Sequence, residues 1–239
     1  MPAGDSHPHQ GHLVVTIDGP AASGKSTLAE RLAAILGLRF LDTGLLYRAV
    51  GRRVIEAGGD PGDPAAALTA VEALTSAEVL ASRLRGEAVG QAASKVAAHP
   101  EVRTALLPFQ RRFAAGDGGA VLAGRDTGTV VCPDAAVKLF VTATAEERAR
   151  RRHEELRRRG DSPMYAAVLA ELRERDRRDS ERAVAPLRAA PDAFVLDTTG
   201  LDPEAALAAA LRHVEGVTGG GWGDAPIHAA IPDGTVREP

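Results

Sequence analysis

Short, almost continuously apolar runs alternate along the chain with longer stretches of mixed polarity. Five runs have the length of a buried strand, at residues 13–18, 39–42, 120–124, 137–142 and 193–197. Strands this short and this apolar are typical of a parallel sheet that is covered on both faces. Helical spacing of apolar residues is found at about residues 24–37, 44–57, 65–83, 101–115, 145–159, 163–182 and 203–215. The alternation predicts an α/β fold, with a five-stranded parallel sheet and helices on both faces.

The same pattern divides the chain into regions. Residues 44–118 contain more helix than a single crossover between two strands requires, so we expect a helical subdomain there. Residues 1–11 and 216–239 are rich in turn-forming residues and show no periodicity. We therefore expect disordered termini and a single domain over residues 12–215.

One predicted helix ends in an unusual run of charge. From Arg173 to Arg182 there is no apolar side chain, and the ten residues include five Arg and four Asp or Glu. A surface helix normally keeps an apolar stripe to bury against the core. The run is therefore either a solvated, salt-bridged helix or the wall of a site for a charged ligand.

Composition narrows the class of protein. A hydrophobic fraction of 44% in 239 residues fits a globular domain, and a net charge of −3 argues against a general nucleic-acid or membrane binder. The single cysteine, Cys132, excludes a disulfide within the chain and a cysteine metal cluster. The sequence has no secretory signal and no apolar run approaching the roughly 18 residues of a membrane span, so we expect a cytoplasmic location.

The strongest chemical signal follows the first strand. The spacing is that of a phosphate-binding loop, because Gly19 is followed by four residues and then by Gly24, Lys25 and Ser26, with an amphipathic helix next. Lys25 would reach the β- and γ-phosphates, and Ser26 would hold Mg²⁺. An ordinary glycine-rich turn is the alternative, but it would not require the strand, the spacing and the Lys-Ser pair together. We expect a nucleoside triphosphate to bind to Gly19, Pro20, Ala21, Ala22, Ser23, Gly24, Lys25, Ser26 and Thr27.

The ends of the next strands favour a small-molecule kinase. The chain contains no Asn, so it lacks the guanine-specifying motif of GTPases. The third strand ends in Arg125-Asp126, at the edge of the sheet where ligands bind, although an internal structural ion pair is also possible. After the second strand, Asp42 and Thr43 can cap a helix that carries Arg48 one turn later.

Five segments in the same order resemble the bacterial cytidylate kinases, over about residues 12–213. They are "IDGPAASGKST", "FLDTGLLYR", "AASKVAAHPEVRTALLPFQRRF", "GRDTGTVVCPDAAVKLFVTATAEERARRR" and "ERDRRDSERAVAPL". The resemblance implies a P-loop NTPase-type fold with a monophosphate-binding subdomain at about 44–118 and a short lid at about 148–165. It also implies a monomer that transfers phosphate from ATP, with Mg²⁺, to CMP or dCMP.

The resemblance carries site residues with it. Ser94, Arg103 and Asp126 are expected to recognise cytosine, although Ser94 could also be a surface hydroxyl of a helix and Arg103 a structural residue. The CMP-binding set is Thr43, Arg48, Ser94, Arg103, Arg125, Asp126, Arg175, Asp179 and Arg182. On a helix Arg175, Asp179 and Arg182 share one face, with Arg175 and Asp179 on the sugar and Arg182 in the phosphate cluster. Lys25, Arg125 and Arg182 are expected to be catalytic.

The lid and one insertion leave questions open. We expect one or two of Arg148, Arg151, Arg152 and Arg158 to reach the triphosphate, and we assign Arg152 to ATP. Residues 58–83 are Ala-rich and helical in pattern, where many relatives carry a β-rich insertion. The choice among CMP, dCMP and UMP therefore remains open. A kinase for another small acceptor, such as UMP or a sugar acid, is the nearest alternative. A nucleotide-dependent RNA-binding module is less favoured, because no aromatic residues interleave the basic stretch.

Overall fold

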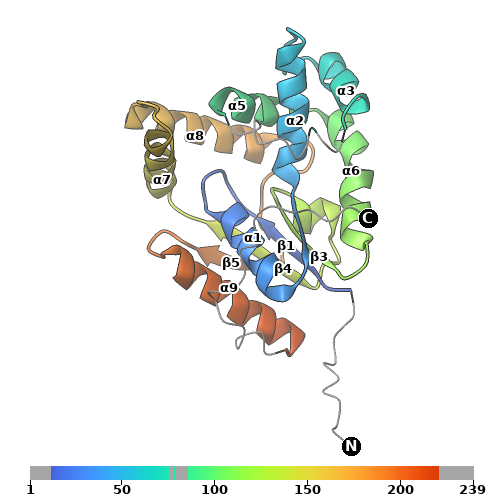
Figure 1. Cartoon of the computed structure of the whole chain (residues 1–239), viewed down its shortest axis with the longest axis vertical. Helices are drawn as coiled ribbons and strands as arrows, with labels where there is room; N and C mark the ends of the chain where they lie inside the picture. Colours follow the sequence, from blue (N-terminus) through green and yellow to red (C-terminus); the bar gives the residue numbers. More distant parts are fainter. Residues whose placement is uncertain (1–11, 76–77, 79–85, 221–239) are drawn as a thin grey trace, which may run out of the picture.

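The computed structural model describes residues 12–75, 78 and 86–220, and these form an α/β fold (Figure 1). One sheet of five parallel strands runs through the described residues in the order β2-β3-β1-β4-β5. The strands are β1 (Val14–Asp18), β2 (Arg39–Asp42), β3 (Ala120–Gly124), β4 (Val137–Thr142) and β5 (Phe194–Asp197). Each lies within one residue of the predicted run, so the predicted sheet is confirmed.

Helices cover both faces of this sheet, which explains why its central strand β3 is apolar and buried along its whole length. On one face, α1 (Lys25–Leu36) packs against β3, α9 (Pro203–Thr218) packs against α1, β4 and β5, and both helices share an apolar cluster with Val121 and Ala123. On the other face, Leu122 packs against α6 (Pro100–Ala115). Because successive side chains of a strand point to opposite faces, β3 is buried on both sides.

The predicted helical insertion between β2 and β3 is present. It consists of α2 (Thr43–Glu56), α3 (Pro64–Glu72), α5 (Glu87–Val96) and α6. These helices share an apolar cluster of their own, separate from the cluster around the sheet. After β4, α7 (Ala145–Arg158) and α8 (Tyr165–Glu181) pack against each other, and a small apolar cluster joins them to Ala21.

The structure differs from the sequence predictions at three helices. Helix α5 was not predicted at all. The helix expected over 65–83 ends at Glu72, and most of its remaining residues lie outside the described part of the chain. Helix α9 continues through Gly216, where a terminal tail was expected, and ends at Thr218. Gly219 terminates it in a left-handed conformation with φ of 68°, which is the usual role of a glycine just beyond a helix.

Several other predictions concern residues that the structure does not describe. The termini 1–11 and 221–239, which were expected to be disordered, lie outside the described residues, and so do residues 76, 77 and 79–83 of the helix expected over 65–83. Between Gly58 and Glu72, α3 is the regular element, and no strand occurs there. None of the described helices has the length and apolar character needed to cross a membrane.

Candidate active site

The carboxyl ends of the central strands open onto a cavity of about 640 Å³. Ligands bind at this edge in open parallel sheets. Of the predicted site residues, those that line the cavity are Ala21, Ala22, Gly24, Lys25, Ser26, Thr27, Thr43, Arg48, Ser94, Arg103, Arg125, Asp126, Arg152, Arg175, Asp179 and Arg182. The three remaining loop residues, Gly19, Pro20 and Ser23, do not line it.

The loop after β1 has the tight backbone that its glycines permit. A Cβ atom at Gly19 would lie 2.0 Å from the carbonyl oxygen of Val141, so only glycine fits there. Gly24 has φ of 86°, and Ala22 has φ of 59°, a left-handed conformation that costs an L-residue roughly 1–2 kcal/mol. Helix α1 starts directly after this loop, so its free N–H groups point toward the loop. This arrangement is suited to binding phosphate oxygens.

Lys25 is buried against the loop that it would serve. Its Nζ atom donates to the carbonyl oxygen of Pro20 at 3.1 Å. Burial lowers the pKa of Lys25 well below its usual value, and the nearby Arg125 lowers it further. A phosphate group beside Lys25 would favour the charged ammonium, because a neighbouring negative charge raises the pKa of an amine.

Ser26 and Thr43 are both fixed by contacts with neighbouring strands. Ser26 Oγ donates to Asp42 Oδ2 at 2.8 Å, and Asp42 Oδ1 accepts from the N–H of Gly44 as the N-cap of α2. Thr43 Oγ1 donates to the carbonyl oxygen of Ala123 at 2.9 Å. The predicted capping role of Asp42 is therefore confirmed, whereas its hydrogen bond with Ser26 was not predicted from the sequence. A hydroxyl and a carboxylate are hard oxygen donors, which fits Mg²⁺ held mainly by phosphates and water.

A buried carboxylate supports the loop that follows β3. Asp18, the last residue of β1, accepts from the N–H and the hydroxyl of Thr127 and from the N–H of Gly128, each at 2.8 Å. Thr127 opens a π-helical turn, Thr127–Val131, directly after Asp126. Burial raises the pKa of Asp18 to about 6, although these N–H donors act in the opposite direction. Asp18 thus holds the segment that carries Arg125 and Asp126.

Asp126 is paired with Arg103 and not with its chain neighbour Arg125. Both partners of the ion pair are buried, and Arg182 lies 3.9 Å away from the other carboxylate oxygen of Asp126. The Arg103 guanidinium also lies over the ring of Tyr47, 5.3 Å from its centroid. An internal Arg125–Asp126 pair, which the sequence left open, is therefore not formed.

Asp179 is the centre of a second buried cluster. Its carboxylate accepts from Arg125 Nε at 3.0 Å and from Ser94 Oγ at 3.3 Å, and Arg175 Nε lies at 3.9 Å. Burial acts to raise the pKa of Asp179, but Arg125, Arg175 and Arg182 lower it overall. Ser94 is buried, so the surface-hydroxyl interpretation was wrong, and its contact is with Asp179 rather than with the Arg103–Asp126 pair.

Cations outnumber carboxylates in the cavity between these two clusters and the phosphate loop. Burial, together with the charge of Arg125, lowers the pKa of Arg175 to about 10, and Arg175 Nε has no hydrogen-bond partner. Burial likewise lowers the pKa of Arg48 and of Arg182. Buried cations in this state favour an anionic ligand. Among the described residues, nine cationic side chains line the cavity against seven carboxylates; the cations are Lys25, Arg48, Arg103, Arg125, Arg151, Arg152, Arg159, Arg175 and Arg182, and the carboxylates are Glu30, Asp42, Glu87, Asp126, Glu155, Glu171 and Asp179.

Arg182 lines the same cavity as Arg175 and Asp179, as the helical spacing of the three residues predicted. Helix α8 ends at Glu181 and Arg182 is its C-cap, with φ of -61°, as in the helix, and ψ of 140°, where the chain leaves it. The guanidinium donates through Nε to the carbonyl oxygen of Ala185 at 2.5 Å.

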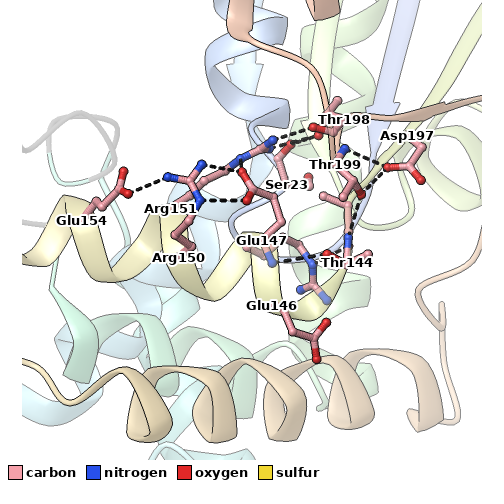
Figure 2. A network of polar contacts seen from close by, with 12 residues as sticks. Ser23, Thr144, Glu146, Glu147, Arg150, Arg151, Glu154, Asp197, Thr198 and Thr199 are labelled. Carbon is pink, nitrogen blue, oxygen red and sulfur yellow. Dashed lines mark hydrogen bonds and ion pairs between the residues drawn. The ribbon is translucent and has the colours of Figure 1, made fainter.

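Arg151 of α7 lies beside the phosphate loop. It donates to the hydroxyl of Thr198 at 3.0 Å and to the carbonyl oxygen of the same residue, while Nε pairs with Glu147 (Figure 2). A Cβ atom at Gly24 would lie 3.9 Å from this guanidinium. Of the four predicted lid arginines, Arg151 is therefore the one that lies beside Gly24 of the loop on the cavity side.

The other three lid candidates have different environments. Arg152, the predicted ATP ligand, lines the cavity and pairs with Glu87 of α5 at 2.8 Å. Arg148 is buried and does not line the cavity. The side chain of Arg158 is 76% exposed, lies 3.7 Å from Glu154 and is also outside the cavity.

Sequence reasoning missed some functional candidates. The contact of Asp42 with Ser26 could have been suspected, because a carboxylate at the end of a parallel strand lies at the ligand edge. The same argument applies to Asp18. Tyr47 and Arg159 also line the cavity, but nothing in the sequence separates them from other helix residues.

Comparisons with known proteins agree with this geometry. The sequence model of the family described as cytidylate kinase matches residues 15–215. A protein of Paramagnetospirillum magneticum named cytidylate kinase is 59% identical over 83% of this chain and 95% of its own length. Proteins of the same name from Granulibacter bethesdensis and Methylocella silvestris are 62% and 58% identical, over 81% and 85% of this chain and 92% and 94% of their own lengths. The chain belongs to the cytidylate kinase family.

Proposed function

We propose that this chain transfers the γ-phosphoryl group of ATP to CMP or dCMP, which gives ADP and CDP or dCDP. The observation that carries the proposal is the group of cations that lines the cavity between the phosphate loop and the Arg103–Asp126 pair, namely Lys25, Arg48, Arg125, Arg175 and Arg182. A cavity of this charge can hold two phosphate-bearing ligands end to end. Phosphate of the donor would lie at the loop, and the base of the acceptor would lie at the buried ion pair.

On the donor side, the loop Gly19–Thr27 and the start of α1 bind the triphosphate. Lys25 is placed to contact its terminal phosphates, and Arg152 and Arg151 approach from α7. Ser26 would hold Mg²⁺, with the carboxylate of Asp42 next to it. A bound Mg²⁺ supplies positive charge that neutralises the phosphates.

On the acceptor side, the two buried clusters divide the nucleotide between them. Asp126 can accept from the exocyclic amine of cytosine, and Arg103 can donate to the ring acceptors. Uracil presents a carbonyl in place of that amine, so Asp126 would be left without a donor. Arg175 and Asp179 take the sugar, and Ser94 supports this position through its contact with Asp179.

The chemistry requires alignment more than proton transfer. An oxygen of the CMP phosphate is already anionic at neutral pH, so it can attack the γ-phosphorus without a strong base, and ADP leaves. Arg125, Arg182 and Lys25 spread the charge that develops, while Arg48 and Thr43 fix the acceptor phosphate. Arg125 is well placed for this role because Asp179 fixes its guanidinium at 3.0 Å.

The proposal is tested by measuring ADP release with ATP and Mg²⁺, with CMP, dCMP, UMP and AMP supplied separately. Turnover with CMP and dCMP, and much weaker turnover with UMP and AMP, is expected. Similar turnover with CMP and UMP would contradict the base-reading role of Arg103 and Asp126 while leaving a kinase. No turnover with any of the four would contradict the proposed reaction. A monomer remains the expectation for the oligomeric state, and a sedimentation experiment tests it.

A further inference from the structure

Arg148 is the most completely enclosed arginine of α7, although it does not line the cavity. Its Nε donates to the carbonyl oxygen of Ala143 at 2.9 Å, which fixes the stem of the side chain to its own helix start. One of its terminal nitrogens donates to the carbonyl oxygen of Ala21, in the phosphate loop, at 3.1 Å. The guanidinium of Arg148 therefore binds the backbone carbonyl of Ala21 from outside the cavity.

The charge of Arg148 is balanced by a residue of α8. Both terminal nitrogens of Arg148 contact the carboxylate of Asp176, at 3.1 and 2.6 Å, in a two-point pair. Such pairs fix orientation as well as charge. Asp176 does not line the cavity, but Arg175 and Asp179 on the same helix do. One side of α8 thus faces the proposed acceptor site while the adjacent side holds Arg148.

The carbonyl that Arg148 contacts has a direct relation to phosphate binding. The carbonyl of Ala21 and the N–H of Ala22 belong to the same peptide, and in a trans peptide they point in opposite directions. Ala22 lines the cavity and has φ of 59°, a conformation that its surroundings must enforce. Fixing the Ala21 carbonyl on the side of Arg148 therefore fixes the direction of the Ala22 N–H as well.

We propose that Arg148 and Asp176 form a positioning pair, which sets the Ala21–Ala22 peptide for triphosphate binding and ties it to α8. The inference rests on the proposed function, because it takes the loop as the ATP-phosphate site. The sequence had offered Arg148 as one of four arginines of which one or two would reach the triphosphate, whereas here Arg148 acts on the loop and not on the phosphates.

The test replaces Asp176 by Asn, which keeps the size of the side chain and removes its charge. The amide cannot accept from both terminal nitrogens of Arg148, so the loop carbonyl loses its fixed partner. We expect the KM for ATP, and the Kd of ATP measured by direct titration, to rise by about tenfold, the size of one lost charge-assisted hydrogen bond. The KM for CMP should change less than twofold, and Asp176→Glu should restore part of the ATP affinity.

The matched control is Glu174→Gln on the same helix. Glu174 pairs with Arg177 at 2.9 Å on the exposed side of α8, so its loss should leave both KM values within twofold. If Asp176→Asn lowers the melting temperature and kcat but leaves the KM and Kd of ATP unchanged, the pair is structural only and the proposal is wrong.

A second variant, Arg148→Lys, covers the case in which Asp176→Asn does not fold. Lysine keeps the charge but cannot contact Ala143, Ala21 and Asp176 together, so the same rise in the KM for ATP is expected. Unchanged ATP affinity in this variant also overturns the proposal. Failure of the proposed function is a separate result, because it shows as absent CMP turnover in the unsubstituted protein.

Discussion

Replacing Asp126 by Asn tests the buried ion pair and the base-reading role in one protein. Asp126 is buried, pairs with the equally buried Arg103 and has Arg182 at 3.9 Å. The amide side chain keeps the shape of the carboxylate and one acceptor oxygen. The substitution therefore removes a single negative charge and leaves two buried guanidinium groups without it.

The size of the effect follows from this arrangement. Removing one partner of a buried pair lowers the free energy of unfolding by about 3–5 kcal/mol. Because the Asn side chain keeps one oxygen that can accept from Arg103, we expect a loss at the lower end, about 3 kcal/mol. At roughly 2–4 °C per kcal/mol for a domain of this size, the melting temperature should fall by about 6–12 °C. The amide that Asp126→Asn introduces can also donate to the uracil carbonyl, so the ratio of kcat/KM for CMP to that for UMP should fall by about tenfold or more.

The assay combines urea unfolding, a thermal melt and kinetics with CMP and UMP. Asp192→Asn is the matched control, because it removes the same charge from a pair with Lys138 in which the Asp192 side chain is 63% exposed. The melting temperature of Asp192→Asn should fall far less than that of Asp126→Asn. An unfolding free energy within about 1 kcal/mol of the parent for Asp126→Asn would refute the argument from burial. An unchanged CMP-to-UMP ratio would refute the base-reading assignment.

Three further outcomes follow from the site. Lys25→Met should lower kcat by orders of magnitude with the fold intact by circular dichroism, and near-normal turnover would contradict its role at the transferring phosphate. Asp179→Ala should raise the KM for CMP more than the KM for ATP, and equal effects would remove Asp179 from the acceptor site. Because the folded pKa of Asp18 is about 6 against 3.8 for a free carboxyl, its stabilising contribution is complete below pH 3.8 and is lost as pH rises through 6. The unfolding free energy of Asp18→Asn minus that of the parent should therefore rise by about 2 kcal/mol from pH 4 to pH 7, and a constant difference would contradict the raised pKa.

The strands could be predicted from the sequence because each contains apolar residues in a short run, and in the central strand β3 all five residues are buried. Most of the strands end in Asp or Gly at the ligand edge. Helix α5 shows no such run, because most of its buried residues are small. It packs against α2 at Gly51, where a Cβ atom would lie 2.9 Å from the Cβ of Ala92. Close approach of two helices through glycine and alanine is a tertiary property, and hydrophobic spacing does not report it.

The sequence predicted which residues line the site better than it predicted which of them form ion pairs with each other. The phosphate loop and the residues after β3 were recognisable from their spacing, and most of them do line one cavity. Which carboxylate neutralises which arginine depends on side-chain direction. Arg125 and Asp126 are neighbours in sequence, yet they contact Asp179 and Arg103 respectively. The chain bends at these two residues, between the end of β3 at Gly124 and the turn that starts at Thr127, and their side chains reach different partners.

The charged half of α8, from Arg173 to Glu181, is neither wholly exposed to solvent nor wholly part of the candidate site. Arg173 and Arg177 form exposed ion pairs, and those contribute little to stability. Arg175 and Asp179 face the cavity, and Asp176 faces Arg148. Apolar residues in this half of α8 would have to replace either Arg175 and Asp179 or Asp176. The first change removes contacts to the proposed acceptor site, and the second removes the partner of Arg148 at the phosphate loop. The helix is polar on every side because two of its sides carry buried charge networks and the third meets water.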